Sequence, residues 1–284
     1  MKDPSAVEDR FQRIARRLPE ELLTGQDGDG LLARPGEGPG RLLGFYSADG
    51  VLAALDSYGV LETLRARGYA HFEVQLDLQP YHHGMRLLAD GLVVCDCRMR
   101  RVRGASDPCI AEFQRQPSIP DPTSPHFLPD LLVVDWLSLA DPRRAFTPER
   151  PRLPGQTHPG SGVGLEVFLI LTLCARRLHL HGLLETPERL HNAVLYQERS
   201  HFLDPTWEGT FLALRDLLNH LSLAELAWAM EEGRVIDDTT GEVIRWRARE
   251  QLLPLDDRLA AYFELPAWRR ARSAARQSCR PRVV

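Results

Sequence analysis

The strongest hydrophobic pattern of the chain lies between residues 131 and 197. Residues 131–139 (LLVVDWLSL) form a nearly continuous apolar run, which is typical of a buried strand. After a glycine-rich turn, residues 165–178 are apolar on almost every side, which indicates a helix that is packed on most of its faces. A short strand over 181–186 and a helix over 188–197 are expected next. This part of the chain therefore predicts a strand, a turn, a helix, a strand and a second helix.

The preceding residues predict helices followed by a meander of strands. Apolar positions at helical spacing predict one helix over 1–23 and one or two helices over 49–67. Alternating apolar and polar positions, with an Ala-Asp-Gly turn between two of the runs, predict three strands. These strands are expected at 71–78, 85–88 and 92–102.

The C-terminal part predicts further helices after residue 206. Ser222 and Glu225 form a capping box at the start of one of them. The expected elements are helices over 207–221, 222–232 and 255–263 and a strand over 243–246. The arginine-rich tail from Arg269 onward is expected to be solvated and partly disordered, because it lacks the interleaved aromatic residues of a single-strand RNA-binding surface. Two segments rich in glycine or proline, 25–40 and 104–130, are expected to be loops.

Composition excludes several classes of protein. The net charge of the 284 residues is only −4, which gives no general attraction to nucleic acid or membrane. No apolar run approaches the roughly 20 residues that a membrane span needs, and the first residues have no apolar signal core, so a cytoplasmic protein is expected. Lys2 is the only lysine, so the high arginine content indicates a high-GC genome rather than anion recognition. Five cysteines without framework spacing fit a reduced compartment.

The glycine-rich turn at 159–164 carries the clearest chemical signal. Three glycines alternate with Ser161 and Val163, so backbone N–H groups can point toward one place without hindrance from Cβ atoms. The helix that follows adds the positive end of its dipole, and the two together suit a phosphate or pyrophosphate. A loop whose glycines only permit a tight entry into the helix remains the alternative.

Two common phosphate-binding motifs do not fit this turn. A Walker A loop needs a lysine before Ser or Thr, and none is available here. The dinucleotide fingerprint would need a glycine at Leu165 or at Val167, depending on the register. No metal site is expected either, because the Cys95-x-Cys97 pair lacks a second pair at zinc spacing and reads as two small buried thiols on one strand face.

The segment from Leu131 to Phe202 resembles the acyl-CoA-binding region of the GNAT superfamily, the Gcn5-related N-acetyltransferases. The resemblance is carried by the sequence PGSGVG at 159–164, by the order of elements around it, and by Leu195-Tyr196 with Phe202. It implies a mixed α/β (α+β) fold with a mostly antiparallel sheet flanked by helices. The implied organisation is an N-terminal helix and loop over 1–40, an acyl-CoA-binding core over 41–205 and a helical extension with a basic tail over 206–284.

The resemblance also implies an activity, the transfer of an acetyl or longer acyl group from acyl-CoA to a small-molecule or protein amine. Tyr196 matches the family tyrosine that protonates the departing thiolate, and Glu185, with Asp135 as a second candidate, is a possible base for the amine. The implied acyl-CoA-binding residues are Gly160, Ser161, Gly162, Val163, Gly164, Leu165 and Asn192. Neither a membrane nor a nucleic acid is an expected partner.

Two other functions remain open. Pro159 stands where the family has Arg or Gln, and Glu166 places a carboxylate in the first turn of the helix, where it would repel phosphates. A catalytically inactive GNAT-like module that binds a ligand or a protein is therefore the first alternative. In the second alternative, the glycine turn binds nothing and the proline-rich loops serve a protein partner.

Overall fold

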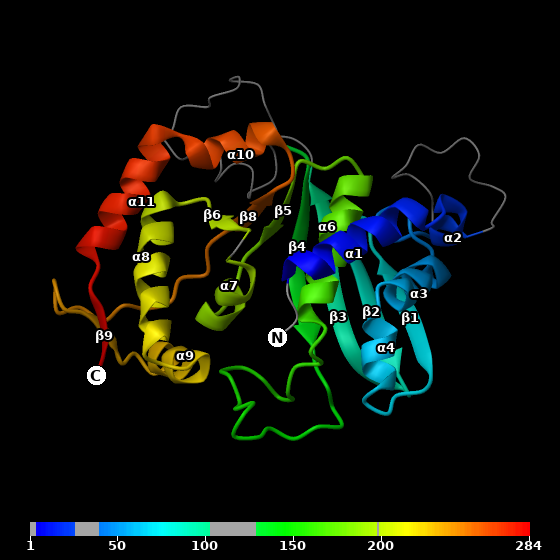
Figure 1. The fold of residues 1–284 in the computed structure, drawn as a ribbon, viewed down its shortest axis with the longest axis horizontal. Coiled ribbons are helices and arrows are strands. Elements are labelled where there is room, and N and C mark those ends of the chain that lie inside the picture. The colour runs from blue at the N-terminus through cyan, green and yellow to red at the C-terminus, as the bar shows by residue number, and fades with distance from the viewer. Residues whose placement is uncertain (1–3, 26–39, 103–128, 198) are drawn as a thin grey trace. The chain divides into compact units, whose positions relative to one another are not determined.

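The computed structural model describes residues 4–25, 40–102, 129–197 and 199–284 (Figure 1). The chain divides into two compact units. The first comprises Met1–Arg101, Leu132–Ala145 and His158–His179, and the second comprises Val102–Leu131, Phe146–Thr157 and Leu180–Val284. Each unit combines antiparallel strand pairs with helices, so the fold is mixed α/β with a mostly antiparallel sheet, as expected.

The strands of the first unit follow one another in the order β1-β2-β3-β4. Their bounds are Phe72–Leu78, His83–Ala89, Leu92–Val102 and Leu131–Leu139. Asp90 and Gly91 turn between β2 and β3 with positive φ, which a two-residue hairpin turn requires. The predicted meander and the apolar strand at 131–139 are therefore confirmed.

The helices of the first unit are mostly those that the pattern predicts. Their bounds are Pro4–Arg17 for α1, Glu20–Thr24 for α2, Ala48–Ser57 for α3, Val60–Arg65 for α4 and Gly164–Arg177 for α6. The prediction of one helix over 1–23 is wrong, because α1 ends before Pro19 and α2 starts after it. A proline disfavours helical backbone at the residue before it, which is Leu18 here.

The second unit has its own strands, in the order β5-β8-β6. Their bounds are Gly182–Glu185, Gln251–Pro254 and His201–Phe202. The helices of this unit are α7 (Leu190–Tyr196), α8 (Pro205–Asp216), α9 (Leu223–Glu231), α10 (Asp257–Glu264) and α11 (Pro266–Ser278). The capping box of Ser222 and Glu225 is present at the start of α9, as predicted.

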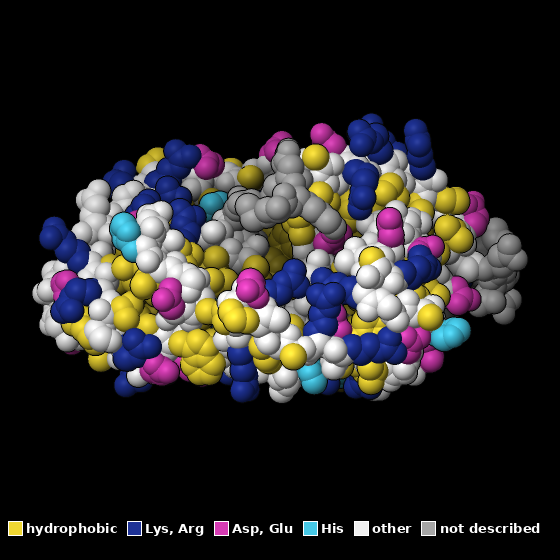
Figure 2. All heavy atoms as spheres, turned by 60° about the horizontal axis from the view of Figure 1, so that its bottom comes forward, with side chains coloured by type: hydrophobic (Ala, Val, Ile, Leu, Met, Phe, Trp, Pro, Cys, Tyr) yellow, Lys and Arg dark blue, Asp and Glu magenta, His cyan; other side chains and the backbone are white. Residues whose placement is uncertain are grey.

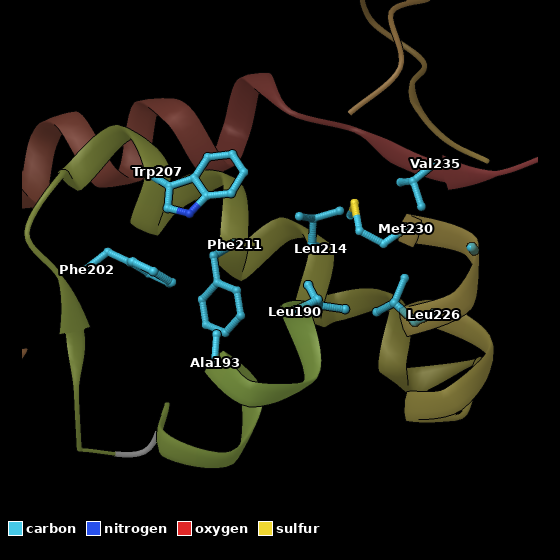
Figure 3. Close-up of a cluster of buried hydrophobic side chains, with 10 residues drawn as sticks. Leu190, Ala193, Phe202, Trp207, Phe211, Leu214, Leu226, Met230 and Val235 are labelled. Carbon is cyan, nitrogen blue, oxygen red and sulfur yellow. The ribbon is translucent and has the colours of Figure 1, made fainter. Parts of the chain in front are cut away.

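A buried cluster from α7, α8 and α9 forms the core of the second unit (Figure 3). Phe202 and Phe211 pack edge to face, with their ring centroids 5.2 Å apart. The predicted strand at 243–246 is wrong: Val243 makes one isolated bridge, to Ile236. Trp246 instead joins the aromatic cluster and donates its indole N–H to the carbonyl of Pro187, at 3.0 Å.

The C-terminal tail is ordered, which corrects the expectation of a solvated, partly disordered segment. Residues of this tail form α11, which packs against α8, and β9 (Pro281–Val283), which pairs with β7 (Val235–Asp237). Trp268 is fully buried. A Cβ atom at Gly209 of α8 would lie 2.3 Å from a carbonyl oxygen of α11, so the glycine permits the close approach of the two helices.

Three arginines of this tail form ion pairs, and one of these joins Arg269 to Glu264. Arg276 contacts Asp216 with two guanidinium nitrogens, and Arg282 contacts Asp238 at 2.9 Å. Basic and acidic side chains are also interspersed on the face shown in Figure 2. Within the described ranges, no helix has the length and apolar character needed to cross a membrane.

Candidate anion-binding turn and residues of the second unit

The glycine turn is fixed to the end of β4 by its backbone. Gly160 forms an antiparallel bridge with Ala140, and the N–H of Asp141 donates to the carbonyl of Pro159 at 2.8 Å. The N–H of Ser161 donates to the carbonyl of Leu139 at 3.4 Å. These bonds hold the turn where α6 begins, so the turn and the helix start form one rigid structure in the first unit.

Gly162 is the position of the turn at which a side chain would be most strained. Its φ of +68° lies in the left-handed region, and a Cβ atom there would stand 2.2 Å from Nη2 of Arg67. The missing side chain therefore lets a guanidinium lie directly against the turn. Arg67 follows α4, and its side chain is only 11% exposed. The positive charge that the sequence lacks at Pro159 is thus supplied from another part of the chain.

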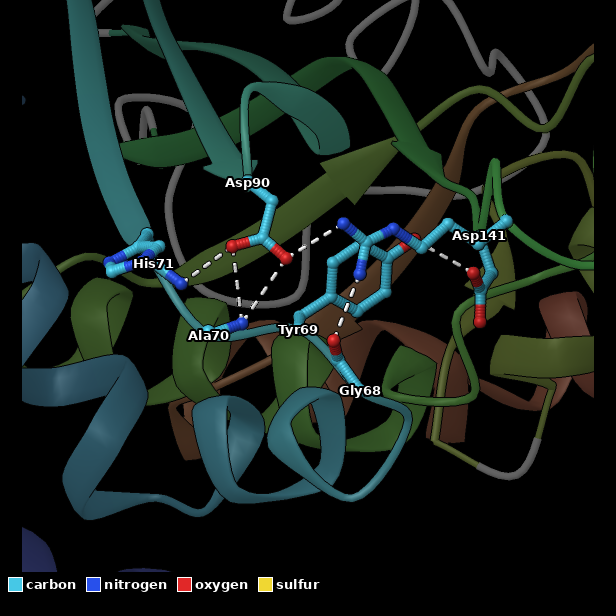
Figure 4. A network of polar contacts seen from close by, with 7 residues as sticks. Gly68, Tyr69, Ala70, His71, Asp90 and Asp141 are labelled. Carbon is cyan, nitrogen blue, oxygen red and sulfur yellow. Dashed lines mark hydrogen bonds and ion pairs between the residues drawn. The ribbon is translucent and has the colours of Figure 1, made fainter.

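Asp141 holds this arginine in place. Its carboxylate is 1% exposed and lies 3.2 Å from Nη1 of Arg67. The other oxygen accepts a hydrogen bond from the hydroxyl of Tyr69 at 2.8 Å (Figure 4). Burial, together with this bond to a carboxylate, raises the pKa of Tyr69, so the phenol stays protonated and donates. Arg144 lies 3.5 Å from the same carboxylate, so three side chains contact Asp141 and its position beside Arg67 is defined.

A second arginine closes the network around Tyr69. The guanidinium of Arg143 stacks on the Tyr69 ring at 4.4 Å from its centroid and donates to the carbonyl of Gly68 at 2.9 Å. It also lies 2.8 Å from Asp90, which accepts bonds from two backbone N–H groups at the start of the neighbouring strand (Figure 4). Those bonds lower the pKa of Asp90, so its carboxylate stays charged opposite Arg143.

The turn also contains a buried polar atom without a partner. Ser161 is fully buried, and its Oγ has no hydrogen-bond partner among the described residues. At the start of α6, Val163 makes no side-chain cap, and the first N–H groups of any helix lack intrahelical partners. The guanidinium of Arg67 thus lies against Gly162, close in sequence to the amides that begin α6, while the hydroxyl of Ser161 is buried. The guanidinium and the amides suit a phosphate oxygen.

The structure places the predicted site residues in both units. Gly160, Ser161, Gly162, Val163, Gly164 and Leu165 lie together at the turn in the first unit. Glu185, Asn192 and Tyr196 lie in the second. Asn192 and Tyr196 share α7 at a spacing of one turn, and both are half-buried. Asp135, the other candidate base, belongs to the first unit, where it forms an exposed ion pair with Arg100 at 3.1 Å.

Glu185 ends β5 in a buried position opposite Gln251 of β8. Oε1 of Glu185 and both amide atoms of Gln251 have no hydrogen-bond partner within the described chain. Burial raises the pKa of Glu185 well above its usual value, which favours the neutral acid. Because a base must be ionised to accept a proton, this environment counts against a role for Glu185 as a base at neutral pH.

Replacing Glu185 with glutamine is expected to flatten the dependence of stability on pH. The raised pKa means that the folded state resists ionisation, so stability falls as the pH rises above about 4.3, by up to about 1.4 kcal/mol per pH unit, until the folded carboxyl ionises. Urea unfolding of wild type and Glu185→Gln between pH 4.5 and 8 measures this. Glu188→Gln, at a 63% exposed side chain, is the control. If the unfolding free energy changes with pH equally in wild type and Glu185→Gln, the raised pKa of Glu185 is contradicted.

Sequence reasoning missed Arg67 and Asp141, which complete the turn. They are 74 positions apart and belong to no common motif, so only the fold brings them together. The one sequence signal was a charged Asp-Pro-Arg-Arg segment, residues 141–144, directly after the most apolar strand.

No group of three or more His, Cys, Asp or Glu side chains in the described part of the chain could hold a metal ion. Cys95 and Cys97 are buried in β3, and burial raises the pKa of Cys95 to about 12, so these thiols stay neutral and inert. Cys109 lies outside the described residues.

A comparison of the sequence with protein-family models and with curated proteins finds no match.

Proposed function

We propose that this protein transfers an acyl group from acyl-CoA to an amine, with the glycine turn as the pyrophosphate site. The observation that carries the proposal is the guanidinium of Arg67, which fills the place of the missing Gly162 side chain beside the start of a helix. A buried carboxylate already fixes this cation, so little ordering is needed when an anion binds.

The backbone N–H groups of Gly162, Val163 and Gly164 would bind the pyrophosphate, together with Arg67. In direct transfer, the amine attacks the thioester without a covalent enzyme intermediate. The main task of the protein is then positioning, which can supply roughly 7–11 kcal/mol. Tyr196, which lies in the second unit, matches the tyrosine that protonates the departing thiolate in the GNAT superfamily. A role for Glu185 as the base has less support, because burial raises its pKa and favours the neutral acid.

A ligand-binding module without catalysis is the second candidate, and Glu166 favours it. This carboxylate is 2% exposed and lies in the first turn of α6, where its charge would oppose a phosphate. Binding of acetyl-CoA without turnover over a wide panel of amines would support the module, whereas acyl transfer to any of these amines would support the enzyme.

The direct test of the site is a thermal-shift titration with acetyl-CoA, longer acyl-CoAs and free CoA. A ligand at 100 times its dissociation constant stabilises a protein by about 2.7 kcal/mol, which is an increase of several degrees in Tm. Gly162→Ala is expected to abolish the shift, because the new methyl group would displace Arg67.

Gly91→Ala is the matched control for this titration. Its φ of +78° imposes similar backbone strain, but nothing lies within 4 Å of the added Cβ atom. This variant is expected to keep the shift of the wild type. The proposed site would be contradicted if no CoA compound raises the Tm of the wild type. It would also be contradicted if both glycine variants lose the increase in Tm equally.

A further inference from the structure

Gln251 is a fully buried glutamine whose amide is not satisfied by the chain. It lies in β8, the middle strand of the order β5-β8-β6 in the second unit. Neither the oxygen nor the nitrogen of its amide has a hydrogen-bond partner within the described residues. A buried polar group without a partner carries the full cost of its desolvation, so folded proteins rarely leave an amide in this state.

Glu185 places a second unpaired group beside this amide. It pairs in register with Gln251 across β5 and β8, and opposite residues of two strands point to the same face of a sheet. Glu185 is itself buried, and its Oε1 has no partner within the described chain. Burial raises the pKa of this carboxyl well above its usual value, which favours the neutral acid. Three buried polar atoms of the two side chains are therefore unpaired on one face of the sheet.

The face that carries these atoms is covered by α7. Phe202 of β6 also pairs in register with Gln251, so it shares the same face. Phe202 belongs to one buried cluster with Leu190 and Ala193 of α7 (Figure 3). The unpaired atoms thus lie on the packed side of the sheet, where bulk solvent does not reach them.

The neighbouring side chains do not supply the missing bonds. Phe202 has no polar atom, and Trp246, whose ring lies 6.2 Å from that of Phe202, already donates its indole N–H to the carbonyl of Pro187. Glu185 and Gln251 form no hydrogen bond with each other. A neutral acid and an amide each offer a donor and an acceptor. The missing partner must therefore be small, uncharged and able both to donate and to accept.

We infer that a buried water molecule bridges Oε1 of Glu185 and the amide of Gln251 and is a fixed part of the second unit. Buried waters typically make about three hydrogen bonds to polar groups that the chain leaves unpaired. The bridge would join β5 to β8 through their side chains, in addition to the backbone ladder. Glu185 is then a structural acid, a role that does not depend on whether the protein transfers an acyl group.

Nuclear Overhauser spectroscopy between water and the side-chain amide of Gln251 tests the site in the wild type. The amide hydrogens, assigned with Gln251→Met, are expected to contact a long-lived water, and a rotating-frame spectrum separates this contact from chemical exchange by its sign. Gln75 of β1 is the control, because it is exposed and its amide donates to Glu73 at 2.9 Å. Gln75 should contact only rapidly exchanging solvent. If the amide of Gln251 contacts no long-lived water, the inference is overturned.

Replacing the two residues singly and together gives an independent test. Methionine is a flexible, unbranched side chain without a strong donor or acceptor, so it removes the polar atoms at similar length. Gln251→Met and Glu185→Met are each expected to lower the urea midpoint, because each leaves the other polar group with fewer hydrogen bonds. The double variant is expected to lose less than the sum of the two, because it removes all the unpaired atoms together.

Glu73→Met, Gln75→Met and their double variant form the matched cycle. These residues make an exposed hydrogen bond, so their losses are expected to be small. If the losses of Glu185→Met and Gln251→Met add in their double variant, the two side chains share no water molecule and the inference is overturned. The spectrum of the wild type separates a water bridge from a direct bond between the two side chains, and it does so even if a variant fails to fold.

Discussion

Trp268→Ala is expected to destabilise the protein by about 3–5 kcal/mol, the usual cost of removing a buried aromatic side chain. Trp268 is fully buried at the start of α11, where it packs against Phe263 and His201. Its indole N–H also donates to the carbonyl of Leu203 at 3.4 Å. The substitution leaves a cavity in the second unit, while the hydroxyl of Tyr262 still donates to the carbonyl of Leu203.

Urea unfolding of Trp268→Ala and Trp136→Ala makes this a matched comparison. Trp136 lies in β4 and is 44% exposed, so the same truncation there should cost far less. If both variants lose a similar amount of unfolding free energy, the packing of α11 is contradicted. That result would favour the solvated tail that the many arginines predict.

Asp141→Asn is expected to cost a comparable amount, about 3–5 kcal/mol, because it leaves a nearly buried guanidinium without its carboxylate. Asp141 is 1% exposed, and its partner Arg67 is 11% exposed. The substitution keeps the size of the side chain, so the loss measures the charge of Asp141 toward Arg67, Arg144 and Tyr69 rather than its packing.

Asp135→Asn is the control for this charge pair. Asp135 and Arg100 also lie 3.1 Å apart, but their side chains are 39% and 24% exposed. An ion pair at the surface is worth less than about 1 kcal/mol. Unfolding free energies measured for both variants at one ionic strength test the difference. Equal losses would mean that Asp141 does not anchor the turn.

The sequence predicted those elements whose pattern is strong and local. The strand at 131–139 and the helix after the glycine turn agree with β4 and α6, because both segments are long apolar runs between turn residues. Pro19 explains the error at the N-terminus, since helical periodicity continued across a residue that interrupts the helix.

The element α11 was missed because its close approach to α8 is made at small residues, and its long side chains there are polar. Gly209 meets the backbone of α11 and Ala275, and Trp268 is the only buried large side chain of that helix. Mean hydropathy is therefore low, and the many arginines of α11 resemble a solvated tail. The packing depends on the match between two surfaces that are distant in the sequence, which a periodicity argument does not detect.

The residues of the candidate site also differ in whether a local sequence pattern predicts them. The glycines of the turn were recognised because they lie close together in the sequence, whereas only the fold brings Arg67 and Asp141 together at the turn. Glu185 was chosen from its place at the end of a strand, and only the structure shows its burial and the unpaired atoms of Gln251 beside it.

Isothermal titration calorimetry with acetyl-CoA tests the central claim, that the turn at Gly162 is an acyl-CoA site, most directly. We expect saturable binding to the wild type and to Gly91→Ala with equal affinity, and no measurable binding to Gly162→Ala, whose Cβ atom would lie 2.2 Å from the guanidinium of Arg67. An absence of binding to the wild type, or equal binding to Gly162→Ala, would contradict the account.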